Sequence, residues 1–508
     1  MNSELSIDQN YNITQYLKDI DIYGMELVWK NILSSIRNHQ NNEIFSIPNF
    51  GELYEIGLAN LNKEKKKEQG KYYTPIDVAN IMSDWFLPLD GQNICDVCCG
   101  TGNLILSYLK KLNELQRATL LKNGNIYLYD KDQLALKICK ETIGLLYGEN
   151  NVKCINVDFL NKEITLPQNC KVICNPPYIR IKEIPDNWDK TEVVKDSKEL
   201  YSAIMEKILQ QSKSAVIITP YSFLGGSKFY SLRKELNNYN GFIVSFDNVP
   251  GNIFGNKKGV FNSNKANSVR ASITVVENKN SKKGFRCSNL IRFKNKEKEQ
   301  LLNIDTLEQF VDKEYQLISK IHPKYEKCSP ELRNLLNKIK QSSKTLSDLL
   351  TENTSQFTLQ VPNTCRYYSV ATIRNLDRTG KHILYFRTKE DRDLAYCYLN
   401  SSFCYWHWRL FDGGITYGLS LLKEMPIFNL SAEDENKLLQ IAKDMQEHED
   451  AYLSYKKNTG KLQENIKFPD KYRKQINKIL LKSLGFDNTD IFYKVHSNTA
   501  LSTTEVLK

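Results

Sequence analysis

Strand-like and helix-like patterns alternate along the first half of the chain, and this alternation constrains the fold more than any other feature of the sequence. Short apolar runs occur at 93–99, 125–130, 152–160, 171–178, 214–220, 242–249 and 271–278. Helical patterns lie between several of these runs, for example over 104–121. Such alternation is typical of a doubly wound, largely parallel sheet. We therefore expect an α/β domain in this part of the chain.

The pattern changes near residue 280, where charged helices and then an aromatic-rich stretch replace the alternation. The chain has 508 residues, which is enough for two or three domains. We expect an N-terminal helical segment at 1–62, an α/β domain at 63–280, a mixed α+β domain at 281–495 and a flexible tail at 496–508.

Composition narrows the class of protein. No apolar run reaches the roughly 18 residues that span a membrane, and the N-terminus has neither the basic start nor the apolar core of a secretory signal. We therefore expect a cytosolic protein whose twelve cysteines are free thiols. Cys95, Cys98 and Cys99 form a cluster, but no second pair stands at zinc-site spacing, so no metal site is expected.

The formal net charge is +11, and most of the excess lies in residues 281–508. A polyanionic partner such as nucleic acid would explain this distribution. A lysine-rich solvated surface would explain it equally well, so charge alone leaves both interpretations open.

Residues suited to ligand binding follow three of the predicted strands. The first strand is followed by DVCCGTGN, in which Gly100 and Gly102 would let the backbone approach a ligand. The second ends in Asp130, which is placed to accept from ribose hydroxyls. The third ends in Asp158 and Phe159, suited to an adenine amino group and to the face of its ring. Each element alone is also consistent with an ordinary turn or a helix cap.

The fourth strand ends in Asn175, Pro176, Pro177 and Tyr178. Prolines donate no backbone N–H and cannot continue a strand ladder, but they hold a rigid, extended backbone. In open α/β sheets, ligands bind at the carboxyl ends of the strands. This motif therefore predicts a site.

Together these strand ends resemble the S-adenosylmethionine-dependent DNA methyltransferases that methylate amino groups, and more narrowly the adenine-specific gamma group with the Asn-Pro-Pro-Tyr motif. The resemblance implies a Rossmann-like methyltransferase domain at 63–280 and a DNA target-recognition domain at 281–495. It implies S-adenosylmethionine as cofactor, S-adenosylhomocysteine as product and no metal. Double-stranded DNA would be the substrate, and the protein would act as a monomer in the bacterial cytosol, associated with the nucleoid. A separate restriction endonuclease is a possible partner, and an orphan regulatory role is the alternative.

The resemblance also assigns roles to residues. It places catalysis on Asn175, Pro176, Pro177 and Tyr178. It places cofactor binding on Tyr72, Tyr73, Thr74, Asp96, Cys98, Gly100, Gly102, Asn103, Asp130, Asp158, Phe159 and Asn175. The target base would stack between Tyr178 and Phe254, with Phe261 as a competing choice for the second ring.

The chemistry explains these residue types. The lone pair of the adenine amino group is delocalised into the ring, so two acceptors aimed at its N–H bonds are needed to free it. The side-chain oxygen of Asn175 and the carbonyl oxygen of Pro176 are those acceptors. A base inside a duplex must be flipped out, and stacking on Tyr178 recovers roughly 1–3 kcal/mol of that cost.

The C-terminal region is aromatic-rich and resembles target-recognition regions that end in an LNS…PI pattern. Arginines in such a region either read guanine or hold phosphates. The candidates for DNA contact are Arg366, Arg374, Arg378 and Arg387. Most of the aromatic residues, including Trp406 and Trp408, are expected to be core.

Several alternatives remain open from the sequence. The Asn-Pro-Pro-Tyr motif also occurs in enzymes that methylate a glutamine amide of a protein, although those lack a long basic region after the core. Methylation of the cytosine N4 amino group usually goes with Ser in place of Asn175. RNA is another possible substrate. A non-catalytic DNA-binding subunit and a fused nuclease are the alternatives outside this reaction class.

Overall fold

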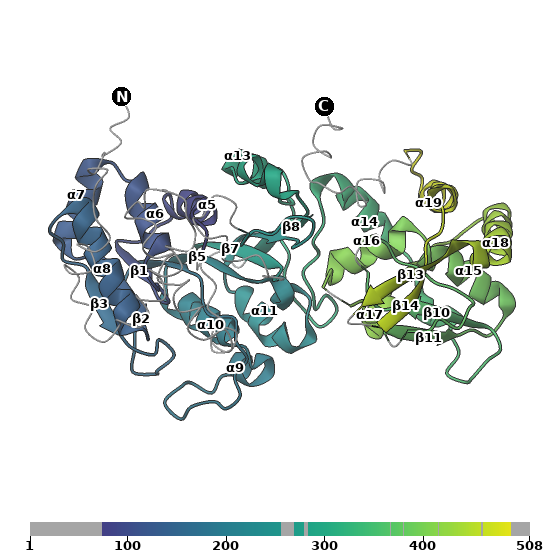
Figure 1. Ribbon diagram of the computed structural model, residues 1–508, viewed down its shortest axis with the longest axis horizontal. Coiled ribbons are helices and arrows are strands. Elements are labelled where there is room, and N and C mark those ends of the chain that lie inside the picture. Colours follow the sequence, from purple (N-terminus) through teal and green to yellow (C-terminus); the bar gives the residue numbers. More distant parts are fainter. Residues whose placement is uncertain are drawn as a thin grey trace. The chain divides into compact units, whose positions relative to one another are not determined.

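The computed structural model describes residues 74–255, 269–278, 283–365, 367–378, 380–414, 416–458 and 461–488 (Figure 1). The predictions for the N-terminal helices, the C-terminal tail, Tyr72, Tyr73, Phe261 and Arg366 lie outside these residues.

The chain divides into two compact units. Unit 1 comprises Met1–Arg286, Arg292–Gln309 and Glu314–Pro323, and unit 2 comprises Cys287–Ile291, Phe310–Lys313 and Lys324–Lys508. Apart from the two short segments of unit 2, the chain up to residue 323 belongs to unit 1, and the predicted boundary at 280 stays a prediction. Strand β8 (Gly284–Ile291) follows residue 280, was not predicted from the sequence, and is divided between the two units.

An eight-stranded mixed sheet confirms the predicted α/β class. Its strands, in spatial order, are β3 (Lys153–Asn156), β2 (Ile126–Asp130), β1 (Asn93–Asp96), β4 (Cys170–Cys174), β5 (Ser214–Pro220), β7 (Ala271–Asn278), β6 (Asn240–Phe246) and β8. The first five strands of this order run parallel. Strand β7 pairs antiparallel with β5 and with β6. Every residue of β4 and of β6 is buried, as expected for strands covered on both faces.

Helices lie on both sides of this sheet, with α5 and α6 above it and α10 and α11 below it in Figure 1. The helices of unit 1 are α5 (Ile76–Phe86), α6 (Asn103–Lys111), α7 (Glu114–Asn123), α8 (Gln133–Tyr147), α9 (Glu192–Ser197), α10 (Leu200–Gln211), α11 (Tyr230–Leu236), α12 (Lys298–Leu301) and α13 (Ile304–Glu308). The helix predicted over 104–121 is two helices, because Asn113 begins a new one with a capping box to Gln116.

Unit 2 has its own hydrophobic core, which includes Trp406 and Trp408 as expected. Its helices are α14 (Arg333–Ile339), α15 (Lys389–Leu399), α16 (Ser402–Phe411), α17 (Leu419–Lys423), α18 (Ala432–Glu447) and α19 (Asp470–Ser483). Three two-stranded sheets pair β9 (Lys344–Thr345) with β12 (Pro426–Ile427), β10 (Thr358–Pro362) with β11 (Lys381–Tyr385), and β13 (Leu453–Asn458) with β14 (Lys461–Ile466). This mixture of helices and strands agrees with the α+β prediction.

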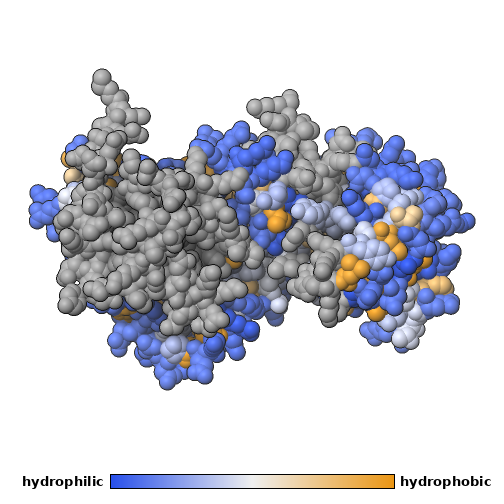
Figure 2. Space-filling model, in the orientation of Figure 1, coloured by the Kyte–Doolittle hydropathy of each residue, from blue (hydrophilic) through white to orange (hydrophobic). Residues whose placement is uncertain are grey.

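The coloured surface in Figure 2 is mainly hydrophilic, with hydrophobic residues in small groups. Among the helices of the described ranges, none combines the length and the apolar character that crossing a membrane requires. The twelve cysteines are all free thiols, as predicted.

Candidate active site

The predicted site residues follow neighbouring parallel strands. Because β3, β2, β1 and β4 are adjacent and parallel, their carboxyl ends share one edge of the sheet. Direct contacts join these ends, since the Gly100 N–H donates to Asp130 Oδ2 over 2.8 Å and the Cys99 N–H donates to the Tyr129 carbonyl over 3.1 Å. The first and second strand ends therefore form one continuous surface.

The Asn175 side chain is held at both ends of its amide. Its Nδ2 donates to Thr74 Oγ1 at 2.9 Å, and its Oδ1 accepts from the Tyr178 hydroxyl at 2.8 Å. The carbonyl oxygen of Ile218, at the end of β5, lies 3.1 Å from the same hydroxyl. These contacts hold the amide of Asn175 at both ends, with its Oδ1 beside the Tyr178 hydroxyl and its Nδ2 beside the Thr74 hydroxyl.

Thr74 links the catalytic motif to the first strand end. It is 5% exposed, its hydroxyl accepts from Asn175, and its carbonyl oxygen accepts from Asn103 Nδ2 at 2.9 Å. Asn103 is the first residue of α6 and follows the predicted cofactor loop directly. Thr74, Asn103 and Asn175, which are distant in sequence, are therefore brought together in the structure.

Asp96 ends β1 with a fully buried carboxyl group. Its Oδ1 accepts from the Cys98 N–H at 3.4 Å, but within the described residues no donor reaches Oδ2. Burial raises the pKa of Asp96 well above its usual value, the Cys98 N–H opposes this rise, and the neighbouring Asp130 adds to it. A buried acceptor without a donor suits a cationic or N–H-bearing ligand group.

The structure explains the two glycines of this loop, Gly100 and Gly102, by different contacts. Gly100 (φ +52°) presents its N–H to Asp130. Gly102 (φ +92°) precedes α6, and a Cβ atom there would stand 2.2 Å from Cys139 Sγ on α8. The sequence reading explained Gly102 by close approach of a ligand. In the structure, the close approach at Gly102 is to Cys139.

The two acids after β2 and β3 are both hydrogen-bonded within the protein. Besides Gly100, Asp130 accepts from the Asp132 N–H at 2.9 Å through Oδ1. Asp158 accepts from the Leu160 N–H through Oδ1 at 3.1 Å, and its side chain is 27% exposed. Phe159 is buried, and its ring meets the ring of Tyr129 edge to face at 5.9 Å.

The two aromatic residues predicted to enclose a base are in contact with each other. The ring centroids of Tyr178 and Phe254 lie 6.1 Å apart at an interplanar angle of 64°, and Phe254 is fully buried. The Phe254 N–H donates to Asn252 Oδ1 at 2.9 Å. The rings meet edge to face in this structure, so a base between them requires one ring to move.

Two of the predicted DNA-contacting arginines are engaged within unit 2. Arg374 forms an ion pair with Asp450. Arg378 donates to Asn465 Oδ1 at 2.6 Å and to Thr364 Oγ1 at 3.0 Å, and desolvation lowers its pKa. Arg387 is exposed.

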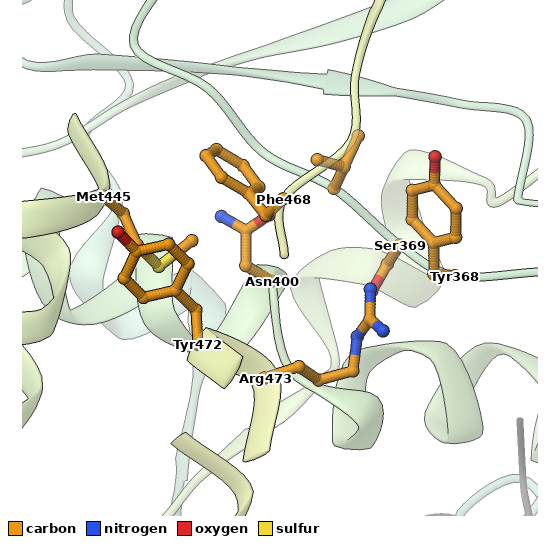
Figure 3. A pocket seen from close by; sticks show the side chains of 8 residues that line it. Tyr368, Ser369, Asn400, Met445, Phe468, Tyr472 and Arg473 are labelled. Carbon is orange, nitrogen blue, oxygen red and sulfur yellow. The ribbon is translucent and has the colours of Figure 1, made fainter. Parts of the chain in front are cut away.

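A small pocket in unit 2 contains none of the predicted site residues. Figure 3 shows its lining, which is Tyr368, Ser369, Val370, Asn400, Met445, Phe468, Tyr472 and Arg473. The Asn400 amide bonds both the N–H and the carbonyl of Ala371, at 3.0 Å each. Arg473 lies over the Tyr368 ring, 5.4 Å from its centroid. These contacts join the stretch 368–371 to Asn400 and to α19.

Sequence reasoning missed two buried lysines that support the site. Lys207 donates to the carbonyl oxygens of Phe159 (2.8 Å) and Asn161 (2.7 Å). Lys298 binds Asp77, in the first turn of α5, and donates to the Gly255 carbonyl at 3.0 Å. A signal was present only for Lys207, which interrupts the apolar face of the helix pattern at 200–211.

Within the described ranges, no three His, Cys, Asp or Glu side chains are grouped so that they could hold a metal ion.

Comparison with known proteins identifies the relatives of this chain. The profile of the family described as N-6 DNA Methylase matches residues 46–327, more than half of the chain. The type II methyltransferase M.VspI of Vibrio sp. (strain 343) is 30% identical over 239 residues, which cover 44% of this chain and 53% of that protein. A release factor glutamine methyltransferase of Clostridium botulinum is 29% identical over 129 residues, covering 23% of this chain and 42% of that protein. The chain thus spans about half the length of these curated relatives.

A cryoEM structure of a DrdV–DNA complex is also similar. The matched region covers 69% of this chain and 43% of the DrdV chain, with 15% sequence identity and a TM-score of 0.44.

Proposed function

Because the chain belongs to the N-6 DNA methylase family, we propose that it is a site-specific DNA methyltransferase that transfers a methyl group from S-adenosylmethionine to the exocyclic amino group of adenine. The observation that carries this proposal is the Asn175 amide, oriented at both ends by Thr74 and Tyr178 on the edge where four parallel strands end.

The residues present fit the cofactor. The Asp96 oxygen that lacks a donor within the described residues would accept from the ammonium group of its methionine part. Asp130 would accept from the ribose hydroxyls and Asp158 from the adenine amino group, with Phe159 beside the ring. Thr74, Cys98, Gly100, Gly102, Asn103 and Asn175 complete the proposed cofactor residues, with Tyr72 and Tyr73 outside the described part. When bound, S-adenosylmethionine supplies an electrophilic methyl group on a sulfonium.

The protein's part in the reaction is to prepare the amino group. Asn175 Oδ1 and the Pro176 carbonyl accept its two N–H bonds, and Pro177 keeps that carbonyl in place. The two acceptors pull the amino nitrogen out of conjugation, so that its lone pair becomes available. No strong base is required, because the amino proton becomes acidic only as the new bond forms.

Base binding requires a movement at the aromatic pair. A flipped adenine would stack on Tyr178 after Phe254 leaves its edge contact with that ring. Phe254 would then cover the opposite face of the base. Unit 2 would contact the duplex, with Arg387 available at its surface.

We further propose the biological setting. The chain would act on double-stranded DNA as a monomer in the bacterial cytosol. It would serve as the modification part of a restriction-modification system with a separate endonuclease, or as an orphan methylase. The proposal requires no metal ion.

Sequencing of modified bases in DNA from cells that express the chain tests this proposal. We expect N6-methyladenine in one short sequence motif with the wild type and with the control Asn238→Ala, which changes an exposed asparagine in unit 1. Asn175→Ala should abolish the signal, since loss of such a preorganised group lowers kcat by about 10²–10³-fold. Absence of methyladenine with the wild type would contradict the proposal.

A second candidate is methylation of a glutamine amide in a protein, which the similarity to the clostridial release factor enzyme favours. Labelled S-adenosylmethionine offered with duplex DNA and with cell protein separates the two. Label transferred to protein and not to DNA would establish the second candidate.

A further inference from the structure

Asp158 is held by three donors from different parts of unit 1. Its Oδ1 accepts from the Leu160 N–H at 3.1 Å. Its Oδ2 accepts from the Trp188 indole N–H at 3.0 Å and from Lys131 Nζ at 2.8 Å. A carboxylate offers about four acceptor positions. Three are used here, and the side chain is 27% exposed, so a ligand has access to the remaining one.

The three donors differ in rigidity. Lys131 is 61% exposed, and exposed ion pairs hold their partners only weakly. The Leu160 N–H belongs to the same turn as Asp158 and moves with it. Trp188 is 8% exposed and comes from another part of the chain. Its indole N–H is therefore the donor that fixes the direction of the Asp158 side chain relative to the sheet.

Trp188 is itself held firmly. It lies on the segment 179–199 that follows Tyr178, and both ends of this segment are joined by backbone hydrogen bonds, from Leu200 to Ile179 and from Ile181 to Lys198. At its middle, the Lys162 N–H donates to the Asn187 carbonyl at 2.8 Å, and a β-bridge pairs residues 161 and 188. The backbone at Trp188 thus has a fixed register against the turn that carries Asp158.

We propose that Trp188 is a positioning residue that makes the cofactor site specific for adenine. Its N–H directs the remaining acceptor position of Asp158 toward the 6-amino group of the base. A hypoxanthine base presents an oxygen there, which a carboxylate repels. The inference rests on the proposed function, because it takes Asp158 as the acceptor for the cofactor's adenine.

Binding of S-adenosylhomocysteine and S-inosylhomocysteine to the full chain tests the proposal. We would measure the Kd of each compound by calorimetry for the wild type, Trp188→Phe and Asp158→Asn. The matched control is Trp85→Phe, which removes another buried indole N–H, one without an acceptor within the described residues. Thermal unfolding of each variant reports whether it is folded.

The wild type should prefer the adenosyl compound. Trp188→Phe should raise the Kd of the adenosyl compound about tenfold, which corresponds to 1.4 kcal/mol, and leave the Kd of the inosyl compound unchanged. Asp158→Asn should also reduce the discrimination, and Trp85→Phe should not. Equal weakening of both compounds by Trp188→Phe shows a merely structural role and overturns the proposal, as does no weakening of either.

Other outcomes separate this inference from the proposed function. If Asp158→Asn keeps the full discrimination while the wild type binds S-adenosylhomocysteine, the inference fails and the proposed function stands. If the wild type binds neither compound, both fail. If Trp188→Phe does not fold, the proposal is tested in the wild type by the NMR shift of the Trp188 indole N–H resonance when each compound binds. It must shift more with the adenosyl compound than with the inosyl compound, and equal shifts overturn the proposal.

Discussion

Replacement of Gly102 by alanine tests the packing of the cofactor loop directly. Gly102 has φ +92° and ψ 19°, and an added Cβ atom would stand 2.2 Å from Cys139 Sγ and 3.3 Å from the Cβ of Cys139. Cys139 is fully buried on α8, so its sulfur has no open space to turn into. The substitution therefore introduces two separate costs.

Their magnitudes follow from the geometry. A left-handed backbone costs a non-glycine residue roughly 1–2 kcal/mol, and overpacking of a buried site costs roughly 1–3 kcal/mol. Gly102→Ala should therefore lower the free energy of unfolding by about 2–5 kcal/mol. In a Cys139→Ala background the clash with the sulfur is gone. The backbone strain then dominates, beside the 3.3 Å contacts to the Cβ of residue 139 and to Ile105, so the same substitution should cost about 1–2 kcal/mol.

Urea unfolding of the four proteins in this double-mutant cycle measures the difference. The coupling between the two sites should be about 1–3 kcal/mol, with Cys139→Ala relieving part of the cost of Gly102→Ala. Additive effects would refute the packing argument. Binding of S-adenosylhomocysteine by the double variant adds a second readout. It should be largely retained, because the added methyl group points at α8, and its loss would favour the original interpretation of Gly102 as a ligand-approach glycine.

Three further predictions concern buried charges. Burial raises the pKa of Glu206 from its usual value of 4.5 to about 7. Between these two pH values the folded chain keeps a proton on Glu206 that the unfolded chain has released. The free energy of unfolding should fall as pH rises through this window, and Glu206→Gln should remove that part of the slope in urea unfolding; an unaltered slope would contradict the assignment. Lys298→Met leaves Asp77 and the Gly255 carbonyl without their ammonium partner and should lower stability by about 1–3 kcal/mol, and a superimposable unfolding curve would rule this out. Burial also raises the pKa of Asp96, so its ionisation at high pH costs stability. Asp96→Asn should therefore unfold at a higher temperature than the wild type at pH 8, yet bind S-adenosylhomocysteine about tenfold or more weakly. A lower unfolding temperature or unimpaired binding would contradict this prediction.

Much of the fold could be predicted because its signals are local. The apolar runs of β1, β2, β4, β5 and β7 lie within a few residues of their predicted limits, because strands of a sheet covered on both faces are rich in apolar residues. Strand β8 was missed because its sequence, GFRCSNLI, mixes polar and apolar residues, although six of its eight residues are buried.

The residues at the candidate site were also predictable, for a related reason. Adjacent parallel strands bring their carboxyl ends to one edge, so the residues that follow each strand must meet. The contact between Gly100 and Asp130 joins the first two strand ends in this way. Thr74, which precedes α5 and follows no strand, reaches the same edge through its bonds to Asn103 and Asn175. The hydrogen-bond and packing partners of these side chains could not be predicted from the sequence, because they depend on which residues the tertiary fold brings close.

By itself, the sequence determined seven of the eight strands of the large sheet, their order along the chain and the motifs at their ends, because apolar runs, glycines and prolines act on the backbone nearby. Only the tertiary structure decided that Gly102 faces Cys139, that the rings of Tyr178 and Phe254 touch, and that Trp188 bonds Asp158. These contacts join residues that are about 30 or more positions apart. They arise from the packing of separate elements, and no local pattern in the chain encodes them.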